Sequence, residues 1–221
     1  MKVAGVDDAG RGPIIGPLVI AGVLIEEKDF PTLRNLGVKD SKLLSPHRRE
    51  QLAEEIKKIA VKWHVVKLSP AEIDYVVENG KKLHKLNRME AHAMAEVIAA
   101  LKPEVAFVDA SDVLAERFGK HIAEKLPFKI RIVSEHKADK KYVAVSAASI
   151  IAKVERDKDI AEIAEKYGDI GSGYITDPKT VEFLEKWVKK HGSYPDFVRK
   201  SWKPAKKMWE DAKARQVRLG E

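Results

Sequence analysis

The chain has 221 residues, of which 44% are hydrophobic and 34% are charged, and it contains no cysteine. This length suffices for one domain with a substantial core and a small appended subdomain. The lack of cysteine excludes disulfides and thiolate metal sites and favours a reducing compartment, so we expect a cytoplasmic protein. We expect no membrane partner, because no apolar run approaches the roughly 18 residues of a membrane span. Lysine and arginine (41) outnumber the acids (34), and the net charge of +7 favours a polyanionic partner such as nucleic acid.

The first half of the chain predicts a β-hairpin followed by helices and one further strand. Residues 2–7 and 16–25 are rich in apolar and β-branched residues and are expected to pair across a turn that contains glycine. Residues 46–60 have helical periodicity, with Ser45 as the expected N-cap and proline at the first helical position. A strand at 61–68 and a helix from 69 to about 80 follow.

In the second half, helices and strands alternate. The expected strands are 104–109 and 128–133, and the expected helices are 87–101, 113–126, 140–167, 179–191 and 203–217. Within 140–167, the small apolar residues 143–152 are typical of a helix that packs closely against a sheet. A hairpin followed by this alternation predicts an α/β fold with a mixed β-sheet flanked by helices.

Acidic residues stand where the predicted strands end. Asp7 and Asp109 each close a strand, and Asp139 precedes the helix expected from 140. Ligands of open α/β sheets bind outside strand ends, and carboxylate oxygens suit a hard divalent cation. Simpler roles are open: Asp7 as a solvated turn residue, Asp139 as a helix cap, and Asp112 as the cap of the helix from 113. A dinucleotide-binding turn is excluded, because its glycine pattern would need glycine where Ile15 stands.

The chain resembles the type 2 ribonucleases H, and specifically the archaeal ribonuclease HII branch. The resemblance rests on motifs that occur in the family's order between about residues 3 and 203. They are Gly-Val-Asp-Asp-Ala-Gly-Arg-Gly-Pro (5–13), Val-Lys-Asp-Ser-Lys-Leu (38–43), Phe-Val-Asp-Ala-Ser-Asp-Val (107–113), His-Lys-Ala-Asp (136–139), Val-Ser-Ala-Ala-Ser-Ile-Ile-Ala-Lys-Val (145–154), Gly-Ser-Gly-Tyr (171–174), Thr-Asp-Pro (176–178) and Val-Arg-Lys-Ser-Trp-Lys (198–203).

The resemblance implies a ribonuclease H-like catalytic domain over 1–176 and a helical substrate-binding extension over 177–221. The implied reaction is hydrolysis of the RNA strand of RNA/DNA hybrids, including a cut 5′ of a single ribonucleotide in duplex DNA, as in ribonucleotide excision repair. It would leave 5′-phosphate and 3′-hydroxyl ends. Two Mg²⁺ or Mn²⁺ ions would assist an in-line displacement. The implied catalytic and metal-binding residues are Asp7, Asp8, Asp109 and Asp139, with Asp7 as the bridging ligand.

The resemblance also implies a substrate-binding set. Gly10, Arg11 and Gly12 correspond to the family's sensor of the 2′-hydroxyl, and Tyr174 to the tyrosine that stacks on the neighbouring sugar. Phosphate contacts are implied for Lys39, Ser41 and Lys42. Further basic residues are expected to meet phosphates as well: Lys137, Arg199, Lys200 and Lys203.

The sequence departs from the family at two places. The family normally has glutamate where this chain has Asp8, and the shorter side chain predicts weakened use of Mg²⁺ and a relative preference for Mn²⁺. Near the C-terminus, Gln216 and Leu219 match half of a sliding-clamp motif without its aromatic anchors, so we expect weak or absent clamp binding. The resemblance also implies a monomer, because the family's archaeal members act alone. Two alternatives are open: a related nuclease such as a junction resolvase, and a catalytically silent hybrid-binding protein disabled by Asp8.

Overall fold

The computed structural model describes residues 1–38, 44–80 and 84–219, with side chains as far as residue 213. Compactness divides the chain into two units. The first comprises Met1–Ala9, Val19–Lys67 and Lys82–Glu155, and the second comprises Gly10–Leu18, Leu68–Lys81 and Arg156–Glu221. The predicted division into a catalytic domain (1–176) and a substrate-binding extension (177–221) concerns function and not compactness, so it stays a prediction.

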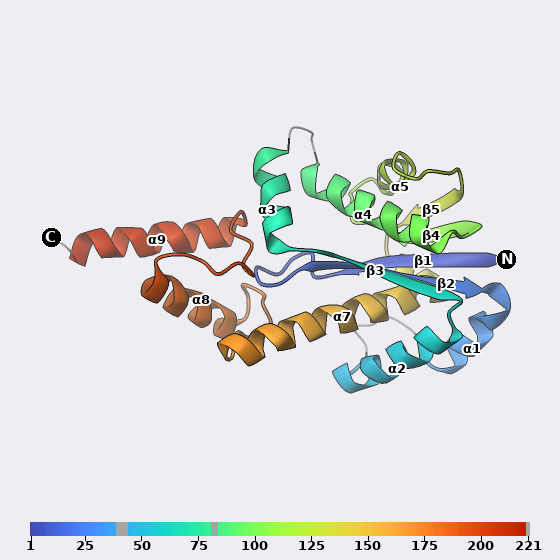
Figure 1. Cartoon of the computed structure of the whole chain (residues 1–221), viewed down its shortest axis with the longest axis horizontal. Coiled ribbons are helices and arrows are strands. Elements are labelled where there is room, and N and C mark those ends of the chain that lie inside the picture. The colour runs from blue at the N-terminus through green and yellow to red at the C-terminus, as the bar shows by residue number, and fades with distance from the viewer. Residues whose placement is uncertain (39–43, 81–83, 220–221) are drawn as a thin grey trace. The chain divides into compact units, whose positions relative to one another are not determined.

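A five-stranded mixed sheet organises the first unit (Figure 1). The strands are ordered β3-β2-β1-β4-β5, with β1 in the centre. Strand β1 is antiparallel to β2, as the predicted hairpin requires, and parallel to β4, which is in turn parallel to β5. The mixed α/β sheet is therefore confirmed. The strand bounds are Lys2–Ala9 (β1), Leu18–Glu26 (β2), Lys62–Leu68 (β3), Val105–Asp109 (β4) and Arg131–Glu135 (β5).

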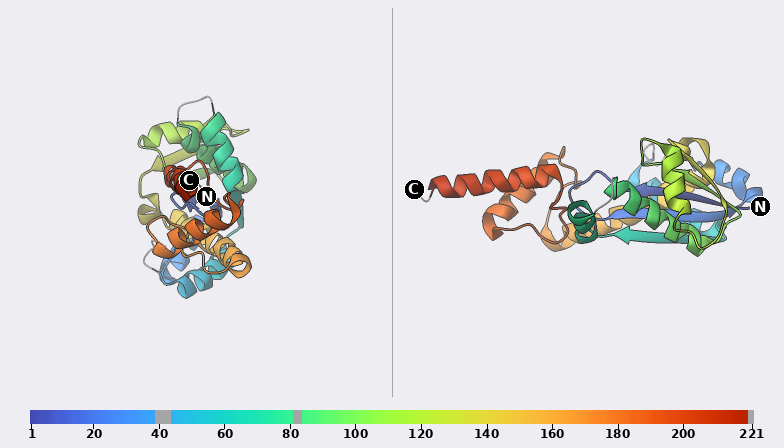
Figure 2. Two further views of the ribbon diagram at one scale, coloured as in Figure 1. Left: turned by 90° about the vertical axis from the view of Figure 1, so that its left-hand side faces the viewer. Right: turned by 90° about the horizontal axis from the view of Figure 1, so that it is seen from above.

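Helices cover both faces of this sheet (Figures 1 and 2). On one face, apolar side chains of β2 form a core with α1, α2 and the first half of α7. On the other face, α4 packs against the sheet and α5 packs beside it. The first unit contains α1 (Phe30–Asn35), α2 (Pro46–Ile59), α4 (Lys85–Leu101), α5 (Ala115–Ala123), the short η1 (Glu27–Asp29) and α6 (Ala138–Lys141), and part of α7 (Val143–Tyr167).

Two glycines let helices approach the sheet closely from opposite sides. A Cβ on Gly5 of β1 would lie 2.1 Å from the backbone of Ala144 in α7, and a Cβ on Gly22 of β2 would lie 2.4 Å from Val97 in α4. Neither position has room for a side chain. The close packing expected of the small apolar run at 143–152 is therefore confirmed.

The second unit is mainly helical and has its own core. It contains α3 (Pro70–Asn79), the end of α7, α8 (Pro178–His191) and α9 (Lys203–Leu219). Its core combines the segment after the Gly-Arg-Gly turn with α8 and the segment before α9. The buried members include Ile14, Ile15, Ile170, Leu184 and Val198.

Several predicted boundaries are confirmed and others are wrong. Ser45 caps α2, since its hydroxyl accepts the Arg48 N–H at 3.3 Å. The strand predicted at 128–133 begins later, at Arg131. The helix predicted at 140–167 is two helices, because the extended backbone of Tyr142 separates α6 from α7. No helix in the described ranges combines the length and apolar content needed to cross a bilayer.

Candidate metal centre and the glycine-arginine-glycine turn

Three of the four predicted acids meet at one edge of the sheet in the first unit. Asp7 lies near the end of β1, and Asp109 is the last residue of β4. The parallel register pairs Val6 with Val108, which sets Asp7 beside Asp109 on the same face. Asp139 reaches them from α6. One carboxylate oxygen of each of the three residues lies within 4.8 Å of the other two.

The environment of this carboxylate cluster disfavours negative charge. Asp7 is only 5% exposed, and burial raises its pKa well above the usual range, with further increases from the nearby charges of Asp8 and Asp109. Burial likewise raises the pKa of Asp109, although the Ala138 N–H, donated to its Oδ1 at 3.0 Å, opposes the shift. Like charges in a desolvated site are stabilised by a bound cation.

Asp8 follows Asp7 in β1 and lies near this cluster, since its charge raises the pKa of both Asp7 and Asp109. Successive side chains of a strand lie on opposite faces of a sheet, so the side chain of Asp8 leaves β1 on the face opposite to that of Asp7. Its Oδ1 accepts a hydrogen bond from the Ser111 hydroxyl at 3.2 Å, and the same hydroxyl lies 2.8 Å from Oε1 of Glu90 in α4. Asp8 is not among the three residues that the structure groups as a possible metal site. Its role as a metal ligand stays a prediction.

The sequence reasoning missed several polar residues around these acids. The hydroxyl of Ser111 bonds to Asp8 and lies between it and the fully buried Glu90. A hydrogen bond from Ser149 of α7 lowers the pKa of Asp7 against the effect of burial. Ser146 donates to the backbone carbonyl of Asp139. A usable signal was present, because Ser146 and Ser149 interrupt an otherwise apolar run that packs on the sheet.

The two simpler helix-capping roles have different outcomes. Asp139 does not cap a helix, because it lies inside α6, whose N-cap is Lys137. Asp112 does hold the start of α5: its Oδ1 accepts the Leu114 N–H at 3.1 Å, and its Oδ2 accepts from Nε of Arg117 at 2.9 Å. The N-cap residue itself is Leu114. The Arg117 guanidinium holds the pKa of Asp112 far below the usual range.

In the second unit, the Gly-Arg-Gly turn is packed against a buried arginine. Gly10 has a φ of +90°, and a Cβ there would lie 2.5 Å from Cδ of Arg156 and 2.7 Å from the Pro17 carbonyl. Only glycine fits this conformation and this approach. The guanidinium of Arg156 also lies 5.5 Å from the ring centroid of Tyr174.

A second buried arginine fixes the carbonyl groups of the same turn. Arg199 is fully buried and donates to the carbonyls of Gly10, Arg11 (2.8 Å) and Gly16 (3.1 and 3.0 Å). Nε1 of Trp202 donates to the Gly12 carbonyl at 3.4 Å. The prediction that Arg199 meets substrate phosphate is therefore wrong: its guanidinium is enclosed and serves the turn.

The structure brings together some of the predicted substrate-binding residues. Gly12 is exposed, and a Cβ on it would lie 3.6 Å from a ring carbon of Tyr174, so the turn and the tyrosine are neighbours. Lys137, Lys200 and Lys203 are exposed, and Lys200 lies 3.8 Å from Asp196. Lys39, Ser41 and Lys42 lie outside the described residues.

The mixed sheet thus carries, at the ends of adjacent strands, a carboxylate cluster that could hold a metal ion. The donor set fits a divalent cation, because it consists of hard carboxylate oxygens in a site that disfavours their charge. Asp7, Asp109 and Asp139 are the residues that would hold it.

Comparison with known proteins identifies the family. The family model "Ribonuclease HII" matches residues 4–205. Ribonuclease HII of Pyrococcus abyssi is 48% identical, covering 99% of this chain and 96% of the relative. The crystal structure of ribonuclease H2 from Pyrococcus horikoshii matches with a TM-score of 0.88 at 45% identity, over 96% of this chain and 99% of that one. An Archaeoglobus fulgidus relative, solved as a PCNA:RNase HII complex, matches with a TM-score of 0.83 at 48% identity, over 93% and 96%.

The chain belongs to the ribonuclease HII family. It is a ribonuclease H, a metal-dependent endonuclease of RNA/DNA hybrids.

Proposed function

We propose that this ribonuclease cuts on the 5′ side of single ribonucleotides embedded in duplex DNA, as well as within RNA/DNA hybrids, and leaves 5′-phosphate and 3′-hydroxyl ends. The observation that supports the chemistry is the convergence of Asp7, Asp109 and Asp139 within 4.8 Å. Carboxylates that converge in a largely desolvated site repel one another, and a bound cation would relieve that repulsion.

In this proposal the chain's acids position the metal. Asp7 stands on the central strand of the sheet and is the proposed bridging ligand, with Asp109 and Asp139 beside it and Asp8 reaching the site from the other face. When bound, two Mg²⁺ or Mn²⁺ ions would supply an activated water and stabilise the leaving 3′-oxygen. The Ala138 N–H and the Ser149 hydroxyl keep Asp109 and Asp7 oriented.

The Gly-Arg-Gly turn is proposed to recognise the ribose. The carbonyls of Gly10 and Arg11 point to the guanidinium of Arg199. In a trans peptide the following N–H is antiparallel to the carbonyl, so the N–H groups of Arg11 and Gly12 point away from Arg199. Donors fixed in this way suit a 2′-hydroxyl, which both donates and accepts. Tyr174 lies beside Gly12 and would stack on the neighbouring sugar.

The positive charge of the chain supports phosphate contacts that position the duplex without reading its bases. Lys39, Ser41 and Lys42 are proposed for this role.

We also propose a monomer in the cytoplasm, acting in ribonucleotide excision repair. Binding to the sliding clamp is proposed to be weak or absent, and size-exclusion chromatography with and without the clamp tests both the monomer and the clamp.

The deciding experiment is cleavage of an end-labelled DNA duplex that contains one ribonucleotide, with Mg²⁺, with Mn²⁺ and with chelator. A metal-dependent cut 5′ of the ribonucleotide is the expected result. A duplex without the ribonucleotide is the matched control and should remain intact. Tight binding without cleavage in either metal would instead identify a silent hybrid-binding protein.

A further inference from the structure

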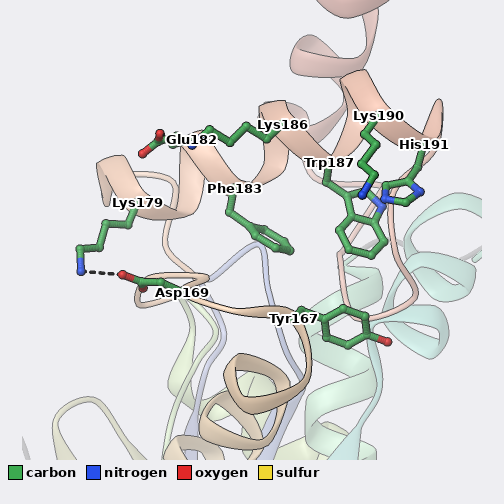
Figure 3. A pocket seen from close by; sticks show the side chains of 9 residues that line it. All are labelled: Tyr167, Asp169, Lys179, Glu182, Phe183, Lys186, Trp187, Lys190 and His191. Atoms are coloured by element: carbon green, nitrogen blue, oxygen red, sulfur yellow. Dashed lines mark hydrogen bonds and ion pairs between the residues drawn. The ribbon is translucent and has the colours of Figure 1, made fainter.

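A recess of about 470 Å³ in the second unit lies between α8 and the segment that follows α7 (Figure 3). It contains none of the residues assigned to catalysis or ribose recognition. Phe183 and Trp187 project into it from α8, and Tyr167 faces them from the end of α7 (Figure 3). The recess therefore has three aromatic walls.

The aromatic wall on α8 lies beside the fully buried face of this helix, and Phe183 also packs against the core. Thr180, Leu184 and Val188 recur every four residues and are buried in the core. Phe183, Trp187 and His191 recur with the same spacing on the adjacent face, where side chains four residues apart lie above one another. Phe183 and Trp187 stay half-buried and His191 is exposed. Large aromatic surface is thus kept partly open to solvent instead of being enclosed.

These aromatics contact one another and Phe197, whose ring centroid lies 4.7 Å from that of Tyr167 and 6.2 Å from that of Phe183, and the recess opens beside them. His191 stacks on Trp187 with ring centroids 4.3 Å apart. Tyr167 meets Trp187 edge to face at 5.6 Å, and Phe183 lies 5.7 Å from Trp187 at a tilt. Faces and edges of this kind accept a further planar ring.

The rim of the recess is basic. Asp169 pairs with Lys179 at 2.7 Å, and Glu182 pairs with Lys186, so both acids in the lining are matched by lysines. Lys190 is the third lysine of the lining, and its amine lies beside the rings of Trp187 and His191 (Figure 3). Three lysines against two carboxylates give the recess a net positive charge.

We propose that this recess binds an unpaired nucleotide of a single-stranded nucleic acid. A base would stack against the aromatic walls, and the lysines would attract its phosphate. A volume of about 470 Å³ lies within the range of small-ligand sites. The proposal rests on the proposed function only in taking nucleic acid as the ligand. Since stacking uses the face that every base has, binding would be tolerant of sequence.

The test is fluorescence anisotropy of a labelled 12-nucleotide oligothymidylate with the full chain in EDTA, which removes divalent metal. Trp187→Ala should weaken binding about fivefold or more, as loss of one stacked base predicts. Trp187→Phe keeps a ring and should stay within about twofold of the unaltered protein. Equal affinities for all three proteins would overturn the proposal.

A matched pair of charge variants keeps the test decisive if Trp187→Ala fails to fold. Lys190 lines the recess, whereas its exposed neighbour Lys189 does not. Lys190→Gln should weaken binding and lower the slope of log affinity against log salt by about 0.7. Lys189→Gln removes the same charge and should change affinity less than about 1.5-fold.

Equal losses for the two lysine variants would assign binding to the general basic surface and overturn the recess as a site. Binding of an acidic, aromatic peptide in place of the oligonucleotide would overturn it too, since it would identify a protein partner. Cleavage of the ribonucleotide-containing duplex by the unaltered chain is scored separately, so failure of the proposed function is distinguished from failure of this site.

Discussion

Asp7 of the first unit and Arg199 of the second are both buried, but their surroundings treat the charge in opposite ways. In the first unit, Asp7 is buried, and the charged neighbours that most affect its pKa, Asp8 and Asp109, have the same sign. In the second unit, Arg199 is more deeply buried, yet its guanidinium donates to the backbone carbonyls of Gly10 and Arg11 in the Gly-Arg-Gly turn and to that of Gly16. Carbonyl oxygens compensate a buried cation directly.

The contrast shows how to tell a binding group from a scaffolding group. A buried acid whose surroundings oppose its charge takes up a proton or binds a cation, and binding of the cation offsets the cost of burying the charge. A buried charge that already has hydrogen-bond or ion-pair partners within the fold holds the neighbouring backbone in place. The sign of the charge does not decide which kind a buried group is: Asp112 is also an acid and is 1% exposed, yet Arg117 compensates its charge.

The strongest test of the contrast is Asp7→Asn. Loss of the central carboxylate should reduce cleavage on the order of 1,000-fold, as expected when a main electrostatic contributor is removed. Because the pKa of Asp7 is raised above its ordinary 3.8, the folded state binds more protons than the unfolded state above that pH. Metal-free stability should therefore fall as pH rises through this window, and the variant should melt at a higher temperature at pH 7.

Thermal melts with and without Mn²⁺ complete this test. The metal should raise the melting temperature of the unaltered protein more than that of Asp7→Asn. A metal-free variant that melts below the unaltered protein would show that Asp7 is compensated by the fold, and the contrast between the two units would fail.

The compensated cation is tested by Arg199→Ala. Removing the guanidinium leaves the carbonyls of Gly10, Arg11 and Gly16 without these donors, and we expect a loss of about 3–5 kcal/mol of unfolding free energy. Arg199→Lys keeps the charge without the planar fork and should lose less. Urea unfolding measures both variants.

Cleavage selectivity separates positioning of the turn from general stability. At a temperature where Arg199→Lys is fully folded, its preference for a single ribonucleotide over an all-RNA hybrid strand should fall. An unchanged preference would mean that Arg199 stabilises the second unit without setting the ribose sensor.

Asp112→Ala sharpens the contrast within the first unit. We expect a loss of about 3 kcal/mol at pH 7, near the lower end for breaking a buried ion pair, because Arg117 is 31% exposed. The folded-state pKa of Asp112 lies below its ordinary 3.8, so its stabilisation is present above that pH and is lost as pH falls. Urea unfolding measured from pH 7 to pH 3 should show the unfolding free energies of the unaltered protein and of Asp112→Ala moving closer together. A difference in unfolding free energy that stays constant over this range would exclude the ion pair as its cause.

The smallest expected effect is that of Asp8→Glu. The longer side chain should extend from its position beside Ser111 toward the metal centre and raise the Mg²⁺-supported rate by a few-fold, on the order of 1 kcal/mol of barrier. The Mn²⁺-supported rate should change less, because larger cations tolerate looser coordination. Cleavage rates in the two metals measure this, and an unchanged or lower Mg²⁺ rate would contradict it.

The sequence alone determined the local features of this protein. The apolar periodicity predicted the central hairpin, most helices and the mixed sheet, because burial of one face imposes a period on the chain. Ser45 before a proline predicted the start of α2, since capping is decided by adjacent residues. The strand ends predicted Asp7 and Asp109 as neighbours, because parallel strands bring their carboxyl ends to one edge.

Only the tertiary structure decided which charges the fold compensates. Arg199 reads in the sequence as one more surface cation, and its contacts with Gly10, Arg11 and Gly16 join residues more than 180 positions apart. The position of the Ser111 hydroxyl between Asp8 and Glu90 likewise depends on packing between remote segments. Compensation of a buried charge depends on distances between remote segments, and a linear pattern of residue types does not contain those distances.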